Sequence, residues 1–400
     1  MAFLTVQHVD IGMTGVRVAG VGLTHFGKHP ERTGRDLFAE ASERALEDAG
    51  VDRAAIEQLN YGNFMGALSE HQGHQGPLMA EAAGIPDAPA TRYESACASS
   101  GVAVREAVKD VRNGEAEVVL VGGAERMNNL GTAGTTEALA IAADDLYEVR
   151  AGMTFPAAYA LMARAYFDRY GGSREELAEI AVKNHDNALD NEYAQYQKPI
   201  SVDDALDAPM IADPLGLFDS CPITDGASAA VLVSDEYAEA HDLDAPVALT
   251  GTGQGGDKMA LQDRNYLART PAAERAAEEA YADAGIGPQD VSVAEVHDCF
   301  TIAEVLALEA LDFYAPGEAI GAAARGETTR DGDRPINLSG GLKAKGHPVG
   351  ATGTSQVVEM TRLLRGDHPN SDAVGGEVGV VHNAGGTVAS TTVHVLEVRT

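Results

Sequence analysis

The chain has 400 residues, a net charge of −32 and 44% hydrophobic residues. This length exceeds one hydrophobic core, so we expect two core units, or one duplicated unit with an insertion. Such acidity would repel a phosphate backbone, which argues against nucleic acid as a partner. The longest apolar runs, such as residues 229–233, are far shorter than the roughly 20 residues that cross a bilayer, and no signal peptide is evident. We therefore expect no membrane span and a cytoplasmic protein.

The scarcity of lysine adds to what the charge implies. Only 7 lysines accompany 22 arginines, whereas Asp and Glu total 61. Salt near 1 M shortens the Debye length to about 3 Å, which screens the repulsion between surface carboxylates. Acidity together with scarce lysine therefore predicts a protein from a salt-adapted, halophilic organism.

The sequence contains an internal repeat. Residues 45–51 (ALEDAGV) and 280–286 (AYADAGI) each end a helical pattern and are offset by 235 positions. Likewise, the helical segment 101–114 and the strand after it resemble segment 353–366 and the strand that follows it. Helices that alternate with short valine-rich strands are typical of helix-covered sheets, so we predict an α/β fold of two duplicated halves.

The first half is interrupted by about a hundred residues. The predicted organisation is a first half of residues 1–123 and 225–244, an inserted segment of residues 124–224, and a second half of residues 245–400. Helical patterns within the insertion cover residues 156–170 and 174–187. Long insertions are usually functional, so we expect a loop domain that binds substrate.

The three cysteines are the first candidates for chemistry. Cys97, Cys221 and Cys299 are odd in number and irregularly spaced, which fits neither a disulfide framework nor a zinc site. A single cysteine is more often a packing residue, so each is judged by its neighbours. Cys97 lies among small residues between a strand and an amphipathic helix, where the helix dipole and free N–H groups favour a thiolate nucleophile. Cys221 precedes a buried strand, and we expect it to be a packing residue.

Histidines in the second half are the natural partners of Cys97. The segment 345–353 (KGHPVGATG) precedes the helix that corresponds to the one after Cys97. If the halves pack about a pseudo-twofold axis, His347 meets Cys97 and can take and return its proton; otherwise it is a loop histidine with local hydrogen bonds. His297-Asp298-Cys299-Phe300 and His382-Asn383 each follow a strand, and strand C-terminal ends are where open α/β sheets assemble sites.

A metal site is not expected. His71 and His74 are close in sequence, but their spacing is not that of a helical i, i+4 pair. No thiol or carboxylate ligand accompanies them.

In combination these loops resemble those of the thiolase family, and more narrowly its branch of sterol-carrier-protein-x and archaeal thiolases. The resemblance covers nearly the whole chain and rests on segments 95–101, 221–227, 297–300, 346–348 and 382–386. It implies a five-layered αβαβα fold with a loop domain, coenzyme A thioesters as substrates with no permanently bound cofactor, and a homodimer or homotetramer. Archaeal relatives associate with a small OB-fold, zinc-ribbon protein, so the resemblance implies such a partner as well.

The sequence departs from the better-known thiolases at two loops. Residues 297–300 read His-Asp-Cys-Phe where those enzymes have Asn-Glu-Ala-Phe, and His382-Asn383 stands where they have a Cys-x-Gly loop. Resemblance to the sterol-carrier branch implies that Cys299 is the base that removes a proton from carbon. His382, which occupies the position of the missing cysteine, is the alternative.

The resemblance implies a two-step reaction. Cys97, assisted by His347, accepts an acetyl group from acetyl-CoA, and a second acetyl-CoA attacks it to give acetoacetyl-CoA; thiolysis is the reverse. Backbone N–H groups of Cys97 and the Gly385-Gly386 turn are expected to stabilise the first oxyanion, and His297 with His347 the enolate. Two alternatives share the main features: another condensing enzyme of this fold, such as a ketosynthase or hydroxymethylglutaryl-CoA synthase, and a non-catalytic scaffold of an acyl-transfer complex.

Overall fold

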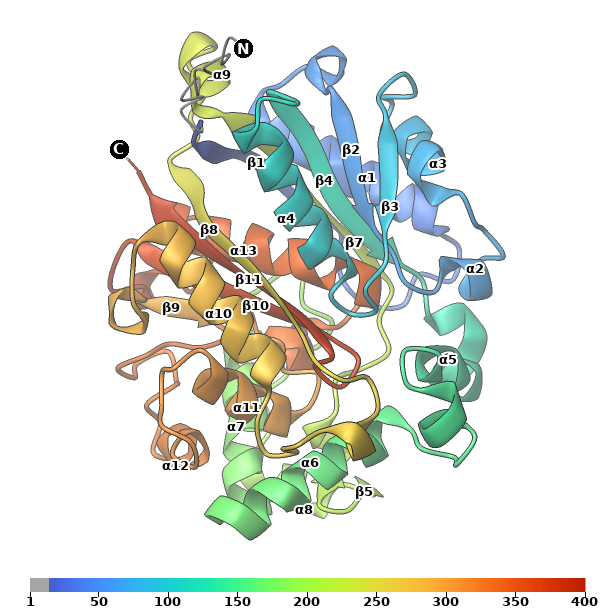
Figure 1. The fold of residues 1–400 in the computed structure, drawn as a ribbon, viewed down its shortest axis with the longest axis vertical. Helices are drawn as coiled ribbons and strands as arrows, with labels where there is room; N and C mark the ends of the chain where they lie inside the picture. Colours follow the sequence, from blue (N-terminus) through green and yellow to red (C-terminus); the bar gives the residue numbers. More distant parts are fainter. Residues whose placement is uncertain (1–13, 400) are drawn as a thin grey trace, which may run out of the picture.

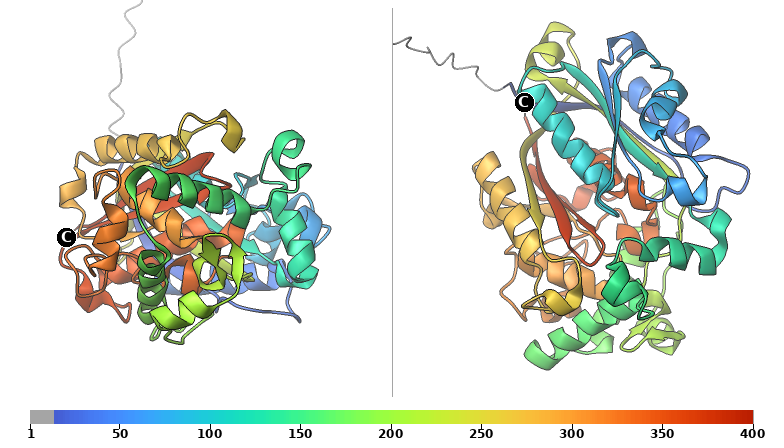
Figure 2. Two further views of the ribbon diagram at one scale, coloured as in Figure 1. Left: turned by 90° about the horizontal axis from the view of Figure 1, so that it is seen from below. Right: turned by 45° about the vertical axis from the view of Figure 1, so that its right-hand side comes forward.

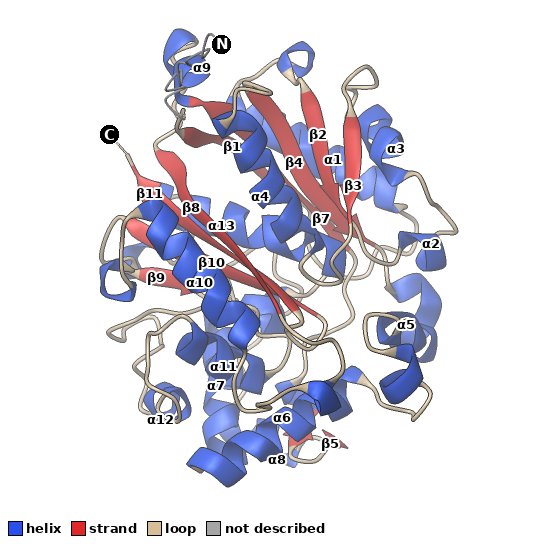
Figure 3. Cartoon of the chain, viewed as in Figure 1, coloured by secondary structure: helices blue, strands red, loops and turns tan. Residues whose placement is uncertain are grey.

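The two halves of the chain form one mixed sheet of nine strands. The computed structural model describes residues 14–399, so residues 1–13 of the expected first half and residue 400 lie outside the description. The strand order is β3-β2-β4-β7-β1-β8-β11-β10-β9 (Figure 3). The strands are β1 Val16–Leu23, β2 Gln58–Gly62, β3 Ala90–Tyr93, β4 Val118–Glu125, β7 Gly226–Ser234, β8 Val247–Gly256, β9 Val293–Glu295, β10 Val378–Gly385 and β11 Ser390–Val398. The two halves join where Arg17 of β1 pairs with Ala248 of β8.

Helices and strands alternate in five layers. The helices are α1 Gly34–Ala49, α2 Gly66–Ser69, α3 Gln75–Ala82, α4 Ser99–Arg112, α5 Gly131–Ala140, α6 Phe155–Tyr170, α7 Arg174–Asn187, α8 Val202–Asp207, α9 Asp235–Ala240, α10 Pro271–Ala284, α11 Thr301–Ala310, α12 Ala319–Ala324 and α13 Thr352–Arg365. On the outside, α1 packs on β1 and β7, and α10 packs on β8 and β11. Between the halves, α4 and α13 share a core with strands of both. The predicted αβαβα fold of duplicated halves is confirmed.

The repeated Ala-Gly pairs end equivalent helices. Gly50 closes α1 with φ +65°, and Gly285 closes α10 with φ +72°. Both values lie in the left-handed region, which glycine adopts without a steric penalty from Cβ. The helix starts differ, because Thr33 and Asp36 form a capping box before α1 whereas Pro271 opens α10. The sequence repeat thus marks a shared way of stopping a helix before the next strand.

A pair of glycines brings the two central helices together. A Cβ atom on Gly353 of α13 would lie 2.6 Å from the Cα atom of Gly101 in α4, so a larger residue does not fit. Beside this contact, the N–H of Thr354 donates to Oγ of Ser100 at 3.0 Å. The N-termini of both helices, and the loops that precede them, therefore lie side by side.

The insertion covers one end of both halves. Residues between β4 and β7 form α5 to α8 and a small hairpin of β5 (Met210–Ala212) and β6 (Leu215–Gly216). Most of this segment is the green region below the sheet in Figure 1, and it lies in front when the molecule is seen from below (Figure 2, left). Its helices α6 and α7 pack against α11 and α12 of the second half. The helical patterns predicted for residues 156–170 and 174–187 correspond to α6 and α7.

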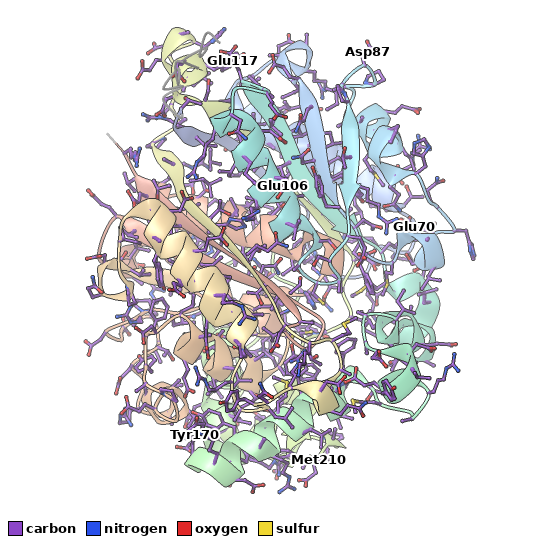
Figure 4. The ribbon with its side chains drawn as sticks, in the orientation of Figure 1. Glu70, Asp87, Glu106, Glu117, Tyr170 and Met210 are labelled. Atoms are coloured by element: carbon purple, nitrogen blue, oxygen red, sulfur yellow. The ribbon has the colours of Figure 1, made fainter. Side chains whose placement is uncertain are left out.

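Four acidic side chains, Glu70, Asp87, Glu106 and Glu117, lie apart from one another in the view of Figure 4. Among the described residues, no helix combines the length and the apolar composition needed to cross a membrane.

Candidate active site

Cys97 lies on a tight turn between β3 and α4. Ala96 has φ +49°, an unusual conformation for a residue with a side chain. The turn is held by Ser99, whose Oγ accepts the N–H of Ser95 at 3.0 Å and donates to the carbonyl of Ala96 at 2.6 Å. The helix begins two residues after Cys97, so its thiol is presented at the N-terminus of α4, as predicted from the small residues of this loop.

His347 is held in one orientation and one tautomer. Its backbone N–H donates to Oγ1 of Thr224 at 3.0 Å, and its ring Nδ1 lies 2.7 Å from Oγ1 of Thr352. Because the Thr352 hydroxyl donates to the carbonyl of Pro348 at 3.0 Å, its oxygen accepts from Nδ1–H of the histidine. The proton of the neutral ring is therefore on Nδ1. Nε2 keeps its lone pair and can act as a base toward Cys97, which lines the same cavity.

His297 is held in the opposite tautomer. The amide nitrogen of Asn383 donates to the carbonyl of Cys97 and to Nδ1 of His297, both at 3.1 Å. His297 therefore carries its proton on Nε2, which has no hydrogen-bond partner among the described residues. The rings of His297 and His347 are perpendicular, with centroids 5.0 Å apart. The site thus combines an imidazole base and an imidazole donor next to one thiol.

The hydrogen bonds of these three side chains argue against a metal ion among them. Cys97, His297 and His347 form the one group within residues 14–399 whose thiol and imidazole ligand atoms lie within 4.8 Å of one another. The lone pair on Nδ1 of His297 is already used by the Asn383 amide, and Nε2 bears a proton. A metal would have to displace that hydrogen bond, so we keep the prediction that the site works without one.

An apolar cavity of about 170 Å³ opens beside Cys97. All three cysteines line it, together with His347 and Gly386. Its apolar lining includes Phe64, Met127, Leu139, Phe155, Ile223 and Val349. Much of this lining comes from the segment between β4 and β7, which fits the role expected for the insertion.

Cys299 and Cys221 are neighbours in the lining of the cavity. The N–H of Cys221 donates to the carbonyl of Cys299 at 3.0 Å. The sequence indicates a packing role for Cys221, but the structure places it at the cavity, half-buried. The pattern that could have revealed this is the ordered Cys-Pro-Ile-Thr-Asp-Gly segment, whose Thr224 also bonds to the backbone of His347.

His382 does not reach the cavity. Side chains alternate along β10, so Asn383 points toward the Cys97 loop while His382 points to the other face of the strand, the side of Val380 and the α10–α11 core. Its Nδ1 accepts the backbone N–H of His297 at 3.4 Å. Of the two candidate bases, Cys299 lines the same cavity as Cys97, whereas His382 lies on the far side of His297.

The Gly385-Gly386 turn lies at the end of β10 and closes over Cys97. The N–H of Gly386 and the N–H of Cys97 itself both lie within hydrogen-bonding reach of Sγ. Gly386 has φ +61°, and a Cβ atom on Gly385 would collide with the carbonyl of Ser95. The two glycines therefore allow the backbone to approach the nucleophile closely.

Burial keeps the central groups neutral. It raises the pKa of Cys97 to about 12 and outweighs the two N–H groups that favour the thiolate. Burial also lowers the pKa of His347 to about 3, and that of His297 well below its ordinary value. The expectation that the helix N-terminus lowers the pKa of Cys97 is therefore wrong, because burial has the larger effect. A neutral thiol fits the expectation that His347 accepts its proton.

This arrangement is that of a cysteine-dependent acyltransferase, and sequence comparison agrees. The thiolase N-terminal domain family matches residues 16–236, and the thiolase C-terminal domain-like family matches residues 253–398. The chain therefore belongs to the thiolase family.

Individual relatives place the chain within that family. It is 41% identical to an acetyl-CoA acetyltransferase of Methanothermobacter thermautotrophicus, over 96% of this chain and 99% of the relative. Sterol carrier protein 2 of Gallus gallus is 32% identical over 92% of this chain and 69% of its own length. Among solved structures, the Ltp2-ChsH2(DUF35) aldolase has a TM-score of 0.81 at 28% identity, covering 96% of this chain and 98% of that one. The predicted resemblance to sterol-carrier and archaeal thiolases is confirmed.

Proposed function

We propose that the protein is a thiolase that condenses two acetyl-CoA molecules to acetoacetyl-CoA and free coenzyme A through an acetyl-Cys97 intermediate, and catalyses thiolysis of 3-oxoacyl-CoA in reverse. The observation that carries this proposal is the pair of opposed imidazoles beside Cys97: His347 offers a lone pair, and His297 offers an N–H. Relatives named acetyl-CoA acetyltransferase, 41% and 39% identical over 96% of the chain, support the same reaction.

The first half-reaction acylates Cys97. Its proton moves to Nε2 of His347, and the sulfur attacks the carbonyl carbon of acetyl-CoA. The oxyanion accepts hydrogen bonds from the N–H groups of Cys97 and Gly386, donors that each typically contribute a factor of about 10²–10³ in rate. The tetrahedral intermediate then expels coenzyme A, whose thiolate takes the proton from His347. The enzyme is left acetylated, with His347 neutral.

The second half-reaction forms the carbon–carbon bond. Cys299 gives its proton to His347 and, as a thiolate, takes a proton from the α-carbon of the second acetyl-CoA. The electron pair moves onto the thioester oxygen, where N–H groups of His297 and His347 stabilise the enolate. The α-carbon attacks acetyl-Cys97, and the released thiolate of Cys97 recovers the proton from His347. Cys299 is preferred to His382 because its side chain lines the cavity.

Cleavage of acetoacetyl-CoA by free coenzyme A, followed spectrophotometrically in concentrated KCl, tests this function. A thiolase cleaves it and yields two acetyl-CoA. A hydroxymethylglutaryl-CoA synthase-like enzyme would instead add acetyl-CoA to acetoacetyl-CoA, a ketosynthase-like enzyme would not produce two acetyl-CoA molecules, and a scaffold subunit would do neither. Absence of cleavage by a folded wild-type protein would refute the proposal.

We further propose a homodimer or homotetramer in the cytoplasm of a halophilic organism, together with a small OB-fold, zinc-ribbon partner. Ile141, Leu146 and Tyr147, near α5, are each more than half exposed, which suits an interface. The Ltp2-ChsH2(DUF35) aldolase carries two protein names, which supports a search for a partner. Light scattering in concentrated KCl tests the oligomer, and co-purification of the tagged chain tests the partner.

A further inference from the structure

Tyr159 reaches the active site from the inserted segment. It lies on α6, is 1% exposed, and stacks on Phe300 with ring centroids 4.6 Å apart. Its hydroxyl donates to the carbonyl of Gly386 at 2.9 Å, and its side chain lines the same cavity as Cys299, the residue before Phe300. Tyr159 therefore bonds to the turn over Cys97 and borders the same cavity as the proposed carbon-acid base.

The single proton of this hydroxyl sets how it can interact with Cys299. A tyrosine hydroxyl donates one hydrogen bond and accepts others. While its proton points to the carbonyl of Gly386, its oxygen can accept from the S–H of neutral Cys299. Once Cys299 has lost its proton to His347, rotation about the C–O bond of Tyr159 turns the hydroxyl proton to the thiolate. No bond in Tyr159 breaks.

The other groups around Cys299 do not stabilise its thiolate form. Burial raises the pKa of Cys299 well above its ordinary value, and the neighbouring groups Cys221, Cys97 and Asp298 raise it further. The hydrogen bond with Tyr159 acts in the opposite direction and lowers this pKa. Charged hydrogen-bond acceptors gain more from such a bond than neutral ones.

We propose that Tyr159 is a catalytic residue of the carbon–carbon bond-forming half-reaction, in which its hydroxyl donates a hydrogen bond to ionised Cys299. This inference rests on the proposed function and deepens it, because it separates the two half-reactions. Acylation of Cys97 proceeds without ionised Cys299. Removal of the α-proton requires it.

The test is Tyr159→Phe, with Tyr166→Phe as the matched control. Tyr166 lies two turns further along α6 and is also buried, but its hydroxyl bonds to Glu309, and it does not line the cavity. In Tyr159→Phe we expect acetyl labelling of Cys97, measured by mass spectrometry, within about threefold of wild type. Exchange of acetyl-CoA α-protons with deuterated water should fall about 10- to 100-fold, the factor supplied by a hydrogen bond to a charged group. Tyr166→Phe should leave both rates near wild type.

Three outcomes would overturn the inference. Unchanged exchange in Tyr159→Phe shows that the hydroxyl is not needed, and an equal fall in labelling and exchange shows that Tyr159 acts only by holding Gly386. Failure of the wild-type protein to acetylate Cys97 would refute the proposed function and this inference together.

A second measurement applies if Tyr159→Phe does not fold. Replacement of Tyr159 by 3-fluorotyrosine nearly preserves its shape but makes the hydroxyl a stronger donor. Alkylation of Cys299 by iodoacetamide, followed on its own peptide, should then shift to lower pH than in wild type. An unshifted profile would also overturn the inference.

Discussion

Gly101 and Gly353 occupy corresponding positions in the two halves and touch each other where α4 crosses α13. Cys97 lies four residues before the first glycine and His347 six residues before the second. The nucleophile and its base are therefore brought together by backbone packing at the pseudo-twofold axis. The number of residues between each side chain and its glycine differs, so Cys97 and His347 are neighbours but do not occupy equivalent positions in the two halves.

This contact predicts a large effect of Gly353→Ala. The added methyl group has no room against Gly101, and overpacking of this kind typically costs about 1–3 kcal/mol in the free energy of unfolding. Helix separation should also slow acetylation of Cys97. Gly375→Ala is the control, because a Cβ atom there meets nothing within 4 Å. Denaturant unfolding and labelling rates check both effects, and equal stability of the two variants would contradict the prediction.

Thr352→Val should impair acylation without unfolding the protein. The substitution keeps the shape but removes the oxygen that holds Nδ1–H of His347. The ring is then free to place its proton on Nε2, where it no longer accepts from Cys97. Loss of one such hydrogen bond corresponds to about a tenfold lower labelling rate. Thr361→Val, on the same helix with its hydroxyl bonded to the carbonyl of Val357, should label normally.

The two candidate bases differ in their expected phenotypes. Cys299→Ala should retain near-normal acetyl labelling of Cys97 and lose α-proton exchange by at least about a hundredfold, the lower range for a positioned base. His382→Ala should affect both steps more mildly, because the one hydrogen bond of its side chain within residues 14–399 is to the backbone N–H of His297. If exchange survives in Cys299→Ala and disappears in His382→Ala, the assignment of Cys299 is wrong.

The pKa values of the catalytic pair predict an unusual pH profile. An imidazole whose pKa is lowered to about 3 stays unprotonated as the pH falls through the ordinary histidine value of about 6.5, so His347 remains a base. Acetyl labelling of Cys97 should therefore be nearly constant between about pH 8 and pH 5. The raised pKa of the Cys97 thiol, about 12, means that ionisation by hydroxide alone occurs only at higher pH. A half-loss of labelling near pH 6.5 would show that His347 is less buried in solution.

The acidic surface predicts a dependence on salt. Lowering KCl from about 1 M to about 0.1 M lengthens the Debye length from about 3 Å to about 10 Å, which restores repulsion among carboxylates. The thermal midpoint should fall on dialysis, and refolding should follow when salt is returned. A midpoint that does not change would remove salt adaptation as the reason for the composition.

Much of the fold and part of the site could be predicted from short stretches of sequence. The repeat, the helix stops at Gly50 and Gly285 and the turn at Cys97 were predictable, because each depends on neighbouring residues. Tyr159 was missed because its contacts join segments more than a hundred residues apart. The direction of the pKa shift of Cys97 was predicted wrongly for a related reason: a helix dipole can be inferred from the sequence, whereas the extent of burial follows from the whole fold.

The roles of Thr352 and Asn383 were not predicted, for another reason. Thr352 begins α13 and Asn383 lies in β10, within segments that were candidates from the sequence, but their function is to fix which nitrogen of a histidine carries the proton. That depends on the direction of a side chain and on the partner of each hydroxyl or amide. Strand alternation along β10 is the one signal that could have placed Asn383 toward Cys97 and His382 away from it.

The pseudo-twofold axis that passes between α4 and α13 also limits stoichiometry. A duplicated chain could in principle carry two reaction centres, one per half. Here the thiol comes from one half, the imidazoles from the other, and both converge at the axis itself. We therefore expect each 41.7 kDa chain to accept one acetyl group at a time. Severing the chain between the halves would leave two fragments that each hold an incomplete centre, rather than two enzymes of reduced size.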